Sequence, residues 1–288
     1  MRTKIVGIVI LMLVATTVVS ATNINVKEKI QPTSSSVDVP VYKVGDSWTY
    51  DYHRMEYRYN GSTLWYTQYS NFTYTVTVTD TTGENYTLKL TSKNVEGRVI
   101  IGSYRLKYTA LTKATDVGIL RKTDLATYHE TWGIKGPVFW LIGSIGLPFP
   151  AQYQQAVTMS FTTPHVQLPF PFTAGVSGTL PGYSFTIQEK QSLYWGLITL
   201  FNNPEKPYTG GPLPYQCEMA NVTVPAGTYN TYNVSVDFPI GIHGHYSFWQ
   251  YYVPEVGNDV KSCVYQTTGG GKPVYNIEGE LVSTTYTP

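Results

Sequence analysis

Charge is missing from a long stretch of this sequence: from Gly136 to Gln188, 53 consecutive residues include no Asp, Glu, Lys or Arg. An average soluble chain carries about 13 charges in such a window. The stretch holds nine aromatic residues, seven prolines and six glycines instead. Its longest proline-free apolar run, Val138 to Leu147, covers ten residues, whereas a membrane-spanning helix needs about 20. This excludes a membrane helix here, and the neutral aromatic surface must be packed or must contact a ligand, lipid or another chain.

Recognisable catalytic motifs are also absent. Gly143-Ser144-Ile145-Gly146 resembles a nucleophile elbow, but it lacks the G-x-S-x-G spacing and no α/β pattern surrounds it. A pair of catalytic carboxylates stays open as an alternative, because the distance between two carboxylates in space cannot be read from a sequence. We therefore expect a protein that is not an enzyme and has no cofactor, with a secreted hydrolase as one alternative.

Metal-ligand patterns are weak. His243 and His245 are the only two histidines that lie close together, and in an extended strand both would project to one face. Pro239 and the neighbouring glycines indicate a loop at this point, and neither an HExxH motif nor a cysteine cluster accompanies the pair. No metal site is expected, and the two histidines are weak candidates only.

Cysteine is scarce. Cys217 and Cys263 are the two cysteines of the chain, and a structural disulfide between them would fit an exported protein. The 45 residues between them would form a closed loop, and the chain-entropy model gives such a disulfide about 4 kcal/mol.

Export is predicted by the first 21 residues. Arg2 and Lys4 form a positive n-region, Ile5 to Val18 an apolar h-region, and Val19-Ser20-Ala21 a cleavage site with small residues. An uncleaved membrane anchor is the alternative. Removal of the signal would change the formal net charge from +1 to −1, and only 14% of all residues are charged, so nucleic acid is not an expected partner. We expect a secreted or cell-surface protein.

The rest of the chain predicts one β-rich domain. Residues 22–40 form a polar Ser/Thr/Pro linker, and residues 41–288 form the domain, with an apolar insertion over 133–205. Five N-glycosylation sequons favour exposed strands and turns of an exported protein. Their asparagines are Asn60, Asn71, Asn85, Asn221 and Asn233.

Alternation of apolar and polar residues gives the fold class. In Asn71–Thr79, the side chains of Phe72, Tyr74, Val76 and Val78 share one face, and the threonines share the other. This is typical of an antiparallel strand with one buried face. Short helices are expected at most over 116–132 and 138–145. Further strands are predicted over 47–59, 86–91, 98–109, 184–201, 218–224, 228–238, 246–253, 259–266 and 274–284.

Two blocks of sequence carry a family resemblance. Tyr42 to Tyr50 (YKVGDSWTY) matches an opening common in secreted prokaryotic proteins. Val224 to Tyr229 (VPAGTY) followed by Phe248 to Lys261 resembles the C-terminal meander of exported archaeal and bacterial proteins related to the lipoprotein-localisation (LolA-like) half-barrel. The resemblance implies a curved antiparallel sheet around an apolar concavity. Lipoprotein trafficking is not implied, because the chain lacks the lipid-attachment cysteine.

Aromatic residues in and beside the neutral segment are the candidate contact residues. Prolines flank the phenylalanines of Leu147–Pro150 and Leu168–Phe172, which favours stiff, extended loops that form rims better than cores. We expect these aromatics to bind an apolar or amphipathic ligand, such as a lipid, in a concave surface. A structural envelope protein that self-associates is the second alternative. The candidate residues are Phe139, Trp140, Phe149, Phe170, Phe172, Tyr183 and Trp195.

Overall fold

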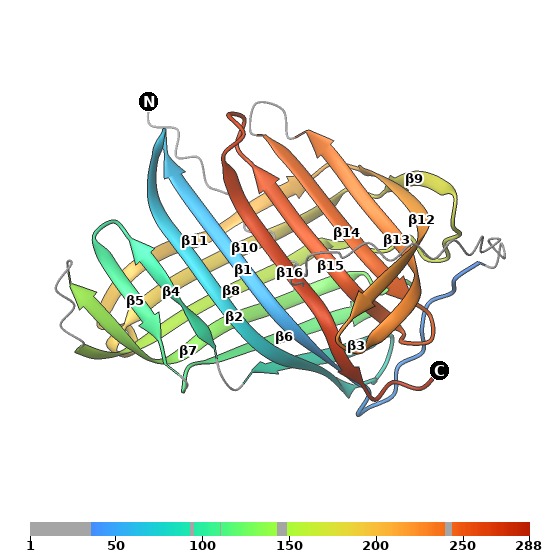
Figure 1. The fold of residues 1–288 in the computed structure, drawn as a ribbon, viewed down its shortest axis with the longest axis horizontal. Helices are drawn as coiled ribbons and strands as arrows, with labels where there is room; N and C mark the ends of the chain where they lie inside the picture. The colour runs from blue at the N-terminus through green and yellow to red at the C-terminus, as the bar shows by residue number, and fades with distance from the viewer. Residues whose placement is uncertain (1–35, 93–94, 110, 143–148, 240–243) are drawn as a thin grey trace.

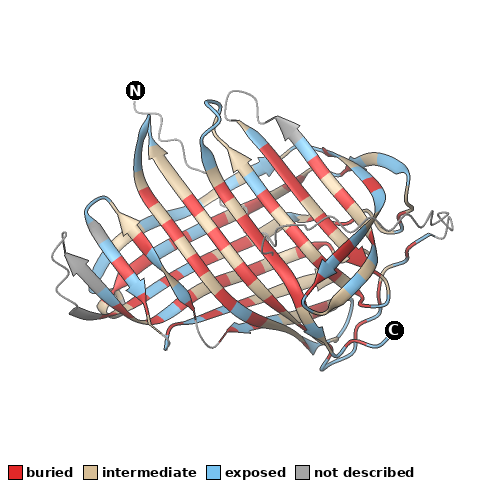
Figure 2. Ribbon diagram, viewed as in Figure 1, coloured by how far each residue is buried: buried red, intermediate tan, exposed pale blue. Residues whose placement is uncertain are grey.

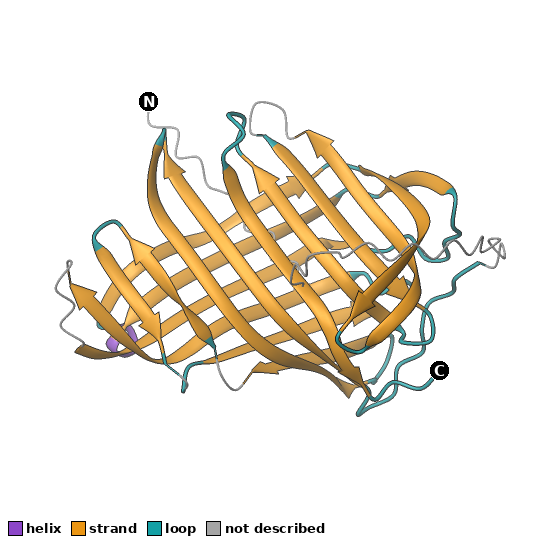
Figure 3. Cartoon of the chain, viewed as in Figure 1, coloured by secondary structure: helices purple, strands orange, loops and turns teal. Residues whose placement is uncertain are grey.

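The computed structural model describes residues 36–92, 95–109, 111–142, 149–239 and 244–288 (Figure 1). The predicted signal peptide and most of the predicted linker lie outside these residues, so export stays a prediction. Within them, almost every segment is a β-strand, and a single turn of 3-10 helix, η1, spans Tyr194–Gly196 (Figure 3). The predicted fold class, mainly β with very little helix, is confirmed.

Sixteen strands follow one another along the described chain. Their bounds are β1 (Ser47–Asn60), β2 (Thr63–Asp80), β3 (Asn85–Ser92), β4 (Glu96–Ile101), β5 (Tyr104–Tyr108), β6 (Lys113–Arg121), β7 (Thr127–Ile142), β8 (Phe149–His165), β9 (Val176–Leu180), β10 (Tyr183–Leu193), β11 (Ile198–Gly210), β12 (Leu213–Val224), β13 (Gly227–Pro239), β14 (His245–Val253), β15 (Asn258–Thr267) and β16 (Pro273–Thr284).

All strand pairs are antiparallel and belong to one sheet, in the order β11-β10-β8-β7-β5-β4-β2-β1-β16-β15-β14-β13-β12-β9. Two strands divide. The first half of β2 pairs with β4 and its second half with β3, while β7 pairs with β6 and then with β5. Two short strand pairs, β4–β5 and β3–β6, therefore connect β2 to β7 side by side. The sheet curves so strongly that β1, β2 and β13–β16 cross over β7, β8 and β10 as a second layer (Figure 1).

The inner faces of the two layers form the core. Burial alternates along the long strands as the period of two requires: in β1, Trp48, Tyr50 and Tyr52 are buried while their neighbours are partly exposed (Figure 2). One large cluster of buried side chains joins both layers, and a smaller one lies beside β12, β13 and β14. The packing of aromatic rings is dense, as in the Tyr52–Phe72 pair with centroids 4.6 Å apart.

The expectation of helices over 116–132 and 138–145 is wrong where the structure describes these residues. β6 and β7 occupy this region and pair with each other and with β3, β5 and β8. The physical reason is visible in β7, where Glu130, Trp132 and Ile134 share the buried face at every second position. Most of the described part of the neutral segment likewise belongs to the sheet, as the end of β7, all of β8 and β9, and the first half of β10, while residues 166–175 connect β8 to β9. No helix in the described residues is long and apolar enough to cross a membrane.

The predicted disulfide is wrong: both cysteines are free. β13 and β14 separate Cys217 on β12 from Cys263 on β15. Three strand spacings amount to about 14 Å, whereas a disulfide needs Cα atoms within about 7 Å. The strand registers also put the two side chains on opposite faces, because Cys217 aligns through Val234 with Gln250, and Cys263 aligns with Trp249, one residue away.

Candidate functional site

A cavity of about 150 Å³ lies between the two layers of the sheet. Its wall combines apolar side chains and tyrosines with polar groups from strands that are far apart in the sequence. The lining residues are Tyr42, Tyr50, Tyr74, Val76, Leu88, Leu90, Asp116, Gly118, Leu120, Leu125, Thr127, Glu130, Gln167, Leu168, Gln250, Asn258 and Asp259. Lys, Arg and His do not occur among them.

Two of the acidic residues come from one layer and form a pair. Asp116 on β6 and Glu130 on β7 are 6% and 7% exposed, and the Glu130 carboxyl donates a hydrogen bond to the Asp116 carboxylate. Asp116 Oδ1 and Glu130 Oε1 are buried and have no hydrogen-bond partner among the described residues. The pair therefore holds one proton between two buried carboxyl groups, as two like charges in close contact require.

The third acidic residue faces the cavity from the other layer. Asp259 on β15 accepts a hydrogen bond from Gln250 Nε2 through Oδ2 at 2.8 Å, and the Tyr50 hydroxyl donates to the Asp259 backbone carbonyl at 2.9 Å. Asp259 Oδ1 and Gln250 Oε1 are buried and receive no hydrogen bond within the described part of the chain. Both residues line the cavity, and each has an acceptor oxygen without a donor, which is costly for buried polar atoms.

Burial sets the protonation of these acids. It raises the pKa of Asp259 to about 7, and the hydrogen bond from Gln250 opposes this only in part. Burial also raises the pKa of Asp116 to about 7, although the Val117 backbone N–H and the hydrogen bond from Glu130 lower it. The pKa of Glu130 is raised well above its usual value, first by burial and then by the charge of Asp116. All three carboxyl groups are consequently easier to protonate than exposed ones.

Aromatic and aliphatic side chains complete the wall. The rings of Tyr50 and Tyr74 stack with centroids 5.4 Å apart. Tyr42 closes the adjacent corner, and its hydroxyl donates to the Gly257 carbonyl at 2.9 Å. Gly118 leaves the β6 side open, since a Cβ atom placed there would meet nothing within 4 Å. The cavity is thus apolar and aromatic on most sides and rich in acceptors at two points.

A strap, residues 166–175 between β8 and β9, covers the cavity on the side of β13 and β14. Leu168 of the strap lines the cavity, and Phe172 is buried against Val234 and Tyr252 in the smaller hydrophobic cluster. The backbone of Phe172 exchanges two hydrogen bonds with Val37, at 2.8 and 3.2 Å. The segment before β1 and the strap therefore hold each other over this end of the cavity.

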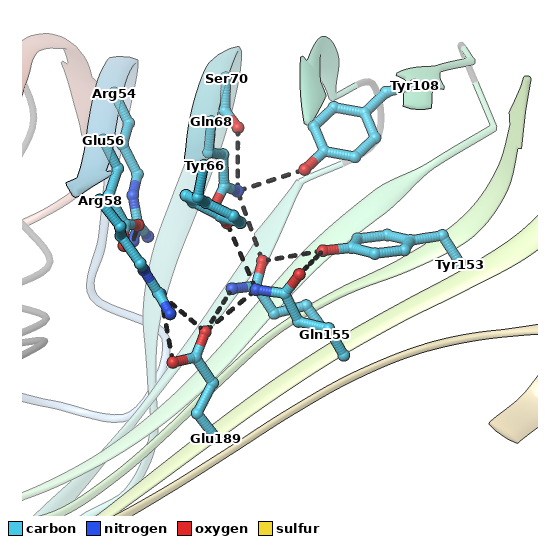
Figure 4. A network of polar contacts seen from close by, with 11 residues as sticks. Arg54, Glu56, Arg58, Tyr66, Gln68, Ser70, Tyr108, Tyr153, Gln155 and Glu189 are labelled. Atoms are coloured by element: carbon cyan, nitrogen blue, oxygen red, sulfur yellow. Dashed lines mark hydrogen bonds and ion pairs between the residues drawn. The ribbon is translucent and has the colours of Figure 1, made fainter. Parts of the chain in front are cut away.

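The other half of the interior is filled by a polar network instead of a cavity (Figure 4). Arg58 on β1 donates to Glu189 on β10 at 2.9 and 3.1 Å, and to Glu56 at 2.6 Å, while Arg54 also contacts Glu56. This connection joins the two layers directly. Around it lie Tyr66, Gln68, Tyr108, Tyr153, Gln155 and Gln191.

The charges of this network are balanced, with two guanidinium groups and two carboxylates. Burial disfavours ionisation of Glu56, but the nearby Arg58 and Arg54 outweigh it, so the pKa of Glu56 is lowered. The amides of Gln155 and Gln191 each donate to Glu189 Oε1, at 3.2 and 3.1 Å. We interpret the network as a structural connection between the layers, since its charges are compensated, in contrast to the acidic cavity.

The predicted contact residues do not gather at one place. Phe172 is buried, so the expectation that it forms an exposed rim is wrong. Its ring packs against the side chains of Val234 and Tyr252 on the sheet. Phe170 packs half-buried beside it, with ring centroids 5.0 Å apart. Tyr183 on β10 is buried against His165 at 4.4 Å, whereas Phe139 on β7 is 42% exposed. The structure describes the backbone of Trp140, Phe149 and Trp195 but not their side chains.

The weak metal candidates stay weak. His243 is not among the described residues, and His245 Nδ1 lies 3.1 Å from Asp237 Oδ1 on the surface. The described ranges contain no group of three His, Cys, Asp or Glu residues that would hold a metal ion.

Two of the sequon asparagines, Asn60 and Asn221, are exposed, and glycosylation stays a prediction.

Sequence reasoning missed the cavity residues, although a signal was present. Glu130 follows the same alternation as Trp132 and Ile134, so its position in a buried period could have marked it. Asp259 follows the turn at Gly257-Asn258 and resembled an ordinary turn residue. Asp116 was hidden by the expectation of a helix.

Comparisons with known proteins add no family assignment. No protein-family model, no curated protein and no solved structure matches the chain. The resemblance to the LolA-like half-barrel stays a prediction, and the function rests on the geometry of the cavity.

Proposed function

We propose that this protein is a binding module that holds a small amphipathic ligand in the acidic cavity between the two layers of its sheet. One observation carries the proposal: Gln250 and Asp259, which each have a buried acceptor oxygen without a donor, line a cavity of about 150 Å³ whose wall is largely apolar and aromatic. Ligand sites typically combine apolar walls with a few convergent polar groups in this way.

The size of the cavity bounds what it buries. In another protein, an apolar cavity of about 150 Å³ holds benzene. We therefore expect a ligand, or the buried head of a larger one, with about six to eight non-hydrogen atoms. Export to the cell surface, predicted from the first 21 residues, would place such a binding module outside the cell.

Native mass spectrometry of the protein purified from its source tests this proposal, because it reports bound molecules and assembly together. The expected result is a monomer with a small-molecule adduct. Gly118→Val should lose the adduct, since the new side chain projects on the same face of β6 as Asp116 and fills space in which its Cβ meets nothing within 4 Å. Thr115→Val, on the exposed face of the same strand, is the matched control and should keep it.

An adduct that Gly118→Val retains would place the ligand elsewhere and contradict the proposal. Defined oligomers without any adduct would favour the alternative of a self-associating envelope protein.

A hydrolase is the second candidate, because Asp116 and Glu130 share one proton as catalytic acid pairs do. Turnover of a peptide or ester library that Asp116→Asn abolishes, without loss of the folded state, would replace the binding proposal by this one.

A further inference from the structure

The acidic cavity presents three carboxyl groups and no Lys, Arg or His side chain to a ligand. Asp116 and Glu130 reach it from β6 and β7, and Asp259 and Gln250 reach it from β15 and β14, so acidic and amide side chains line the space from both layers. The described Lys and Arg residues do not line it. In the polar network of Figure 4, by contrast, Arg58 balances Glu189 directly.

We propose that the ligand of this cavity carries a protonated amine, which binds between the Asp116–Glu130 pair and the Asp259 and Gln250 oxygens. This inference rests on the proposed function and names the chemical class of its ligand. An ammonium group has three donors and no acceptor, which complements the free acceptors of the cavity. Its charge would replace the missing counter-ion, and charge-assisted hydrogen bonds are stronger than neutral ones.

The aromatic wall fits the same chemistry. Tyr42, Tyr50 and Tyr74 line the cavity, and the faces of tyrosine rings attract cations within about 6 Å. A metal ion is a poorer match, because no group of three metal-ligating side chains occurs in the part of the chain that the structure describes. The aliphatic side chains Leu88 and Leu90 would contact the apolar body of the amine.

The amine should bind more tightly as the pH rises from 5 to 8. The titratable groups that face the site are Asp116 and Glu130 from one layer, Asp259 from the other, and the tyrosines of the wall. Asp116 and Asp259 ionise over this range, whereas burial raises the pKa of Tyr42, Tyr50 and Tyr74 further above their usual value. Each carboxylate that forms adds attraction for the ammonium group.

Isothermal titration calorimetry at pH 8 with three matched probes tests the inference. Cyclohexylamine, cyclohexanol and cyclohexanecarboxylate share one ring that suits the cavity and differ in charge. The expected result is binding of cyclohexylamine at least tenfold tighter than that of either other probe. Glu130→Gln and Asp259→Asn should each weaken the amine at least tenfold. Asp51→Asn, the same charge change on the outer face of β1, should leave it unchanged.

Every outcome separates the two proposals. Equal or tighter binding of the alcohol or the carboxylate overturns the amine inference and leaves the binding function standing. Amine binding that survives both cavity variants also overturns it, and if those variants fail to fold, Gly118→Val provides the same test without altering a carboxyl group. If none of the three probes binds but the protein from its source carries an adduct, the amine inference alone is refuted. If no probe binds and no adduct is found, the proposed binding function is refuted as well.

Discussion

Asp259→Asn should change how the stability of the ligand-free protein depends on pH. In the folded state Asp259 is 4% exposed, and burial raises its pKa to about 7, from an ordinary value near 3.8. Between these two values the folded protein holds a proton that the unfolded chain releases. The free energy of unfolding therefore falls as the pH rises from about 4 to about 7 and is level above that range.

The magnitude follows from the shift. A difference of about three pKa units corresponds to roughly 4 kcal/mol, which this carboxyl group alone removes from the stability between pH 4 and pH 7. Asparagine has nearly the same shape, stays neutral and keeps an oxygen that accepts the hydrogen bond from Gln250. We expect the two proteins to be equally stable within about 1 kcal/mol at pH 4, and the variant to be more stable by up to about 4 kcal/mol at pH 8.

Urea unfolding of both proteins at pH 4, 6 and 8 measures this difference. Asp116, Glu130 and His165 titrate in both proteins, so their contributions cancel when one profile is subtracted from the other. Asp51→Asn on the outer face of β1 is the control for the loss of one carboxyl group and should not reproduce the difference of up to about 4 kcal/mol at pH 8. A difference for Asp259→Asn that stays constant from pH 4 to pH 8 would refute the burial of this carboxyl group and the electrostatics of the cavity.

Three further predictions concern packing and chemistry outside the cavity. Phe172→Ala should cost about 3–5 kcal/mol because the ring is buried, and Phe139→Ala, at a 42% exposed site, about 0.5 kcal/mol; equal small losses in urea unfolding would return Phe172 to the surface. Mass spectrometry after alkylation under denaturing conditions should label both Cys217 and Cys263, and an unlabelled pair would restore the disulfide. Glu189→Gln should lower the free energy of unfolding by about 3–5 kcal/mol, since Arg58 loses its partner across the layers; a loss under 1 kcal/mol would show that the contact is unimportant.

The strands with a clear period of two were predictable from the sequence. β1, β3 and β13–β16 lie within one residue of their predicted ranges, because alternating residues and Gly or Pro turns mark them, whereas β2 and β12 begin eight and five residues earlier than predicted. The ranges 98–109 and 184–201, each predicted as one strand, fall on two strands each, β4 with β5 and β10 with β11. β6, β7, β8 and β9 were missed. In β7 and β8 glycines and prolines interrupt the pattern, as at Gly133 and Gly136, and partners far along the chain supply the hydrogen bonds that decide the structure.

The candidate site was not predictable for a different reason. Asp116, Glu130 and Asp259 line one cavity because the sheet curves over itself, and neither this curvature nor the pairing of β2 and β7 with two strands each has a local signal. The Pro-flanked phenylalanines gave a misleading signal. Prolines do keep the strap out of the regular strands, but the Phe172 ring of the strap packs against apolar side chains of β13 and β14. The nearby Leu168 nevertheless lines the cavity, so this segment does border the proposed site.

A crystal structure of the protein purified from its source, without added ligand, tests the central claim most directly. The account predicts electron density for a small organic molecule between the Asp116–Glu130 pair and the Asp259 and Gln250 oxygens, with a donor atom within about 3 Å of at least one carboxylate. A cavity that contains only ordered waters hydrogen-bonded to these four side chains would contradict it.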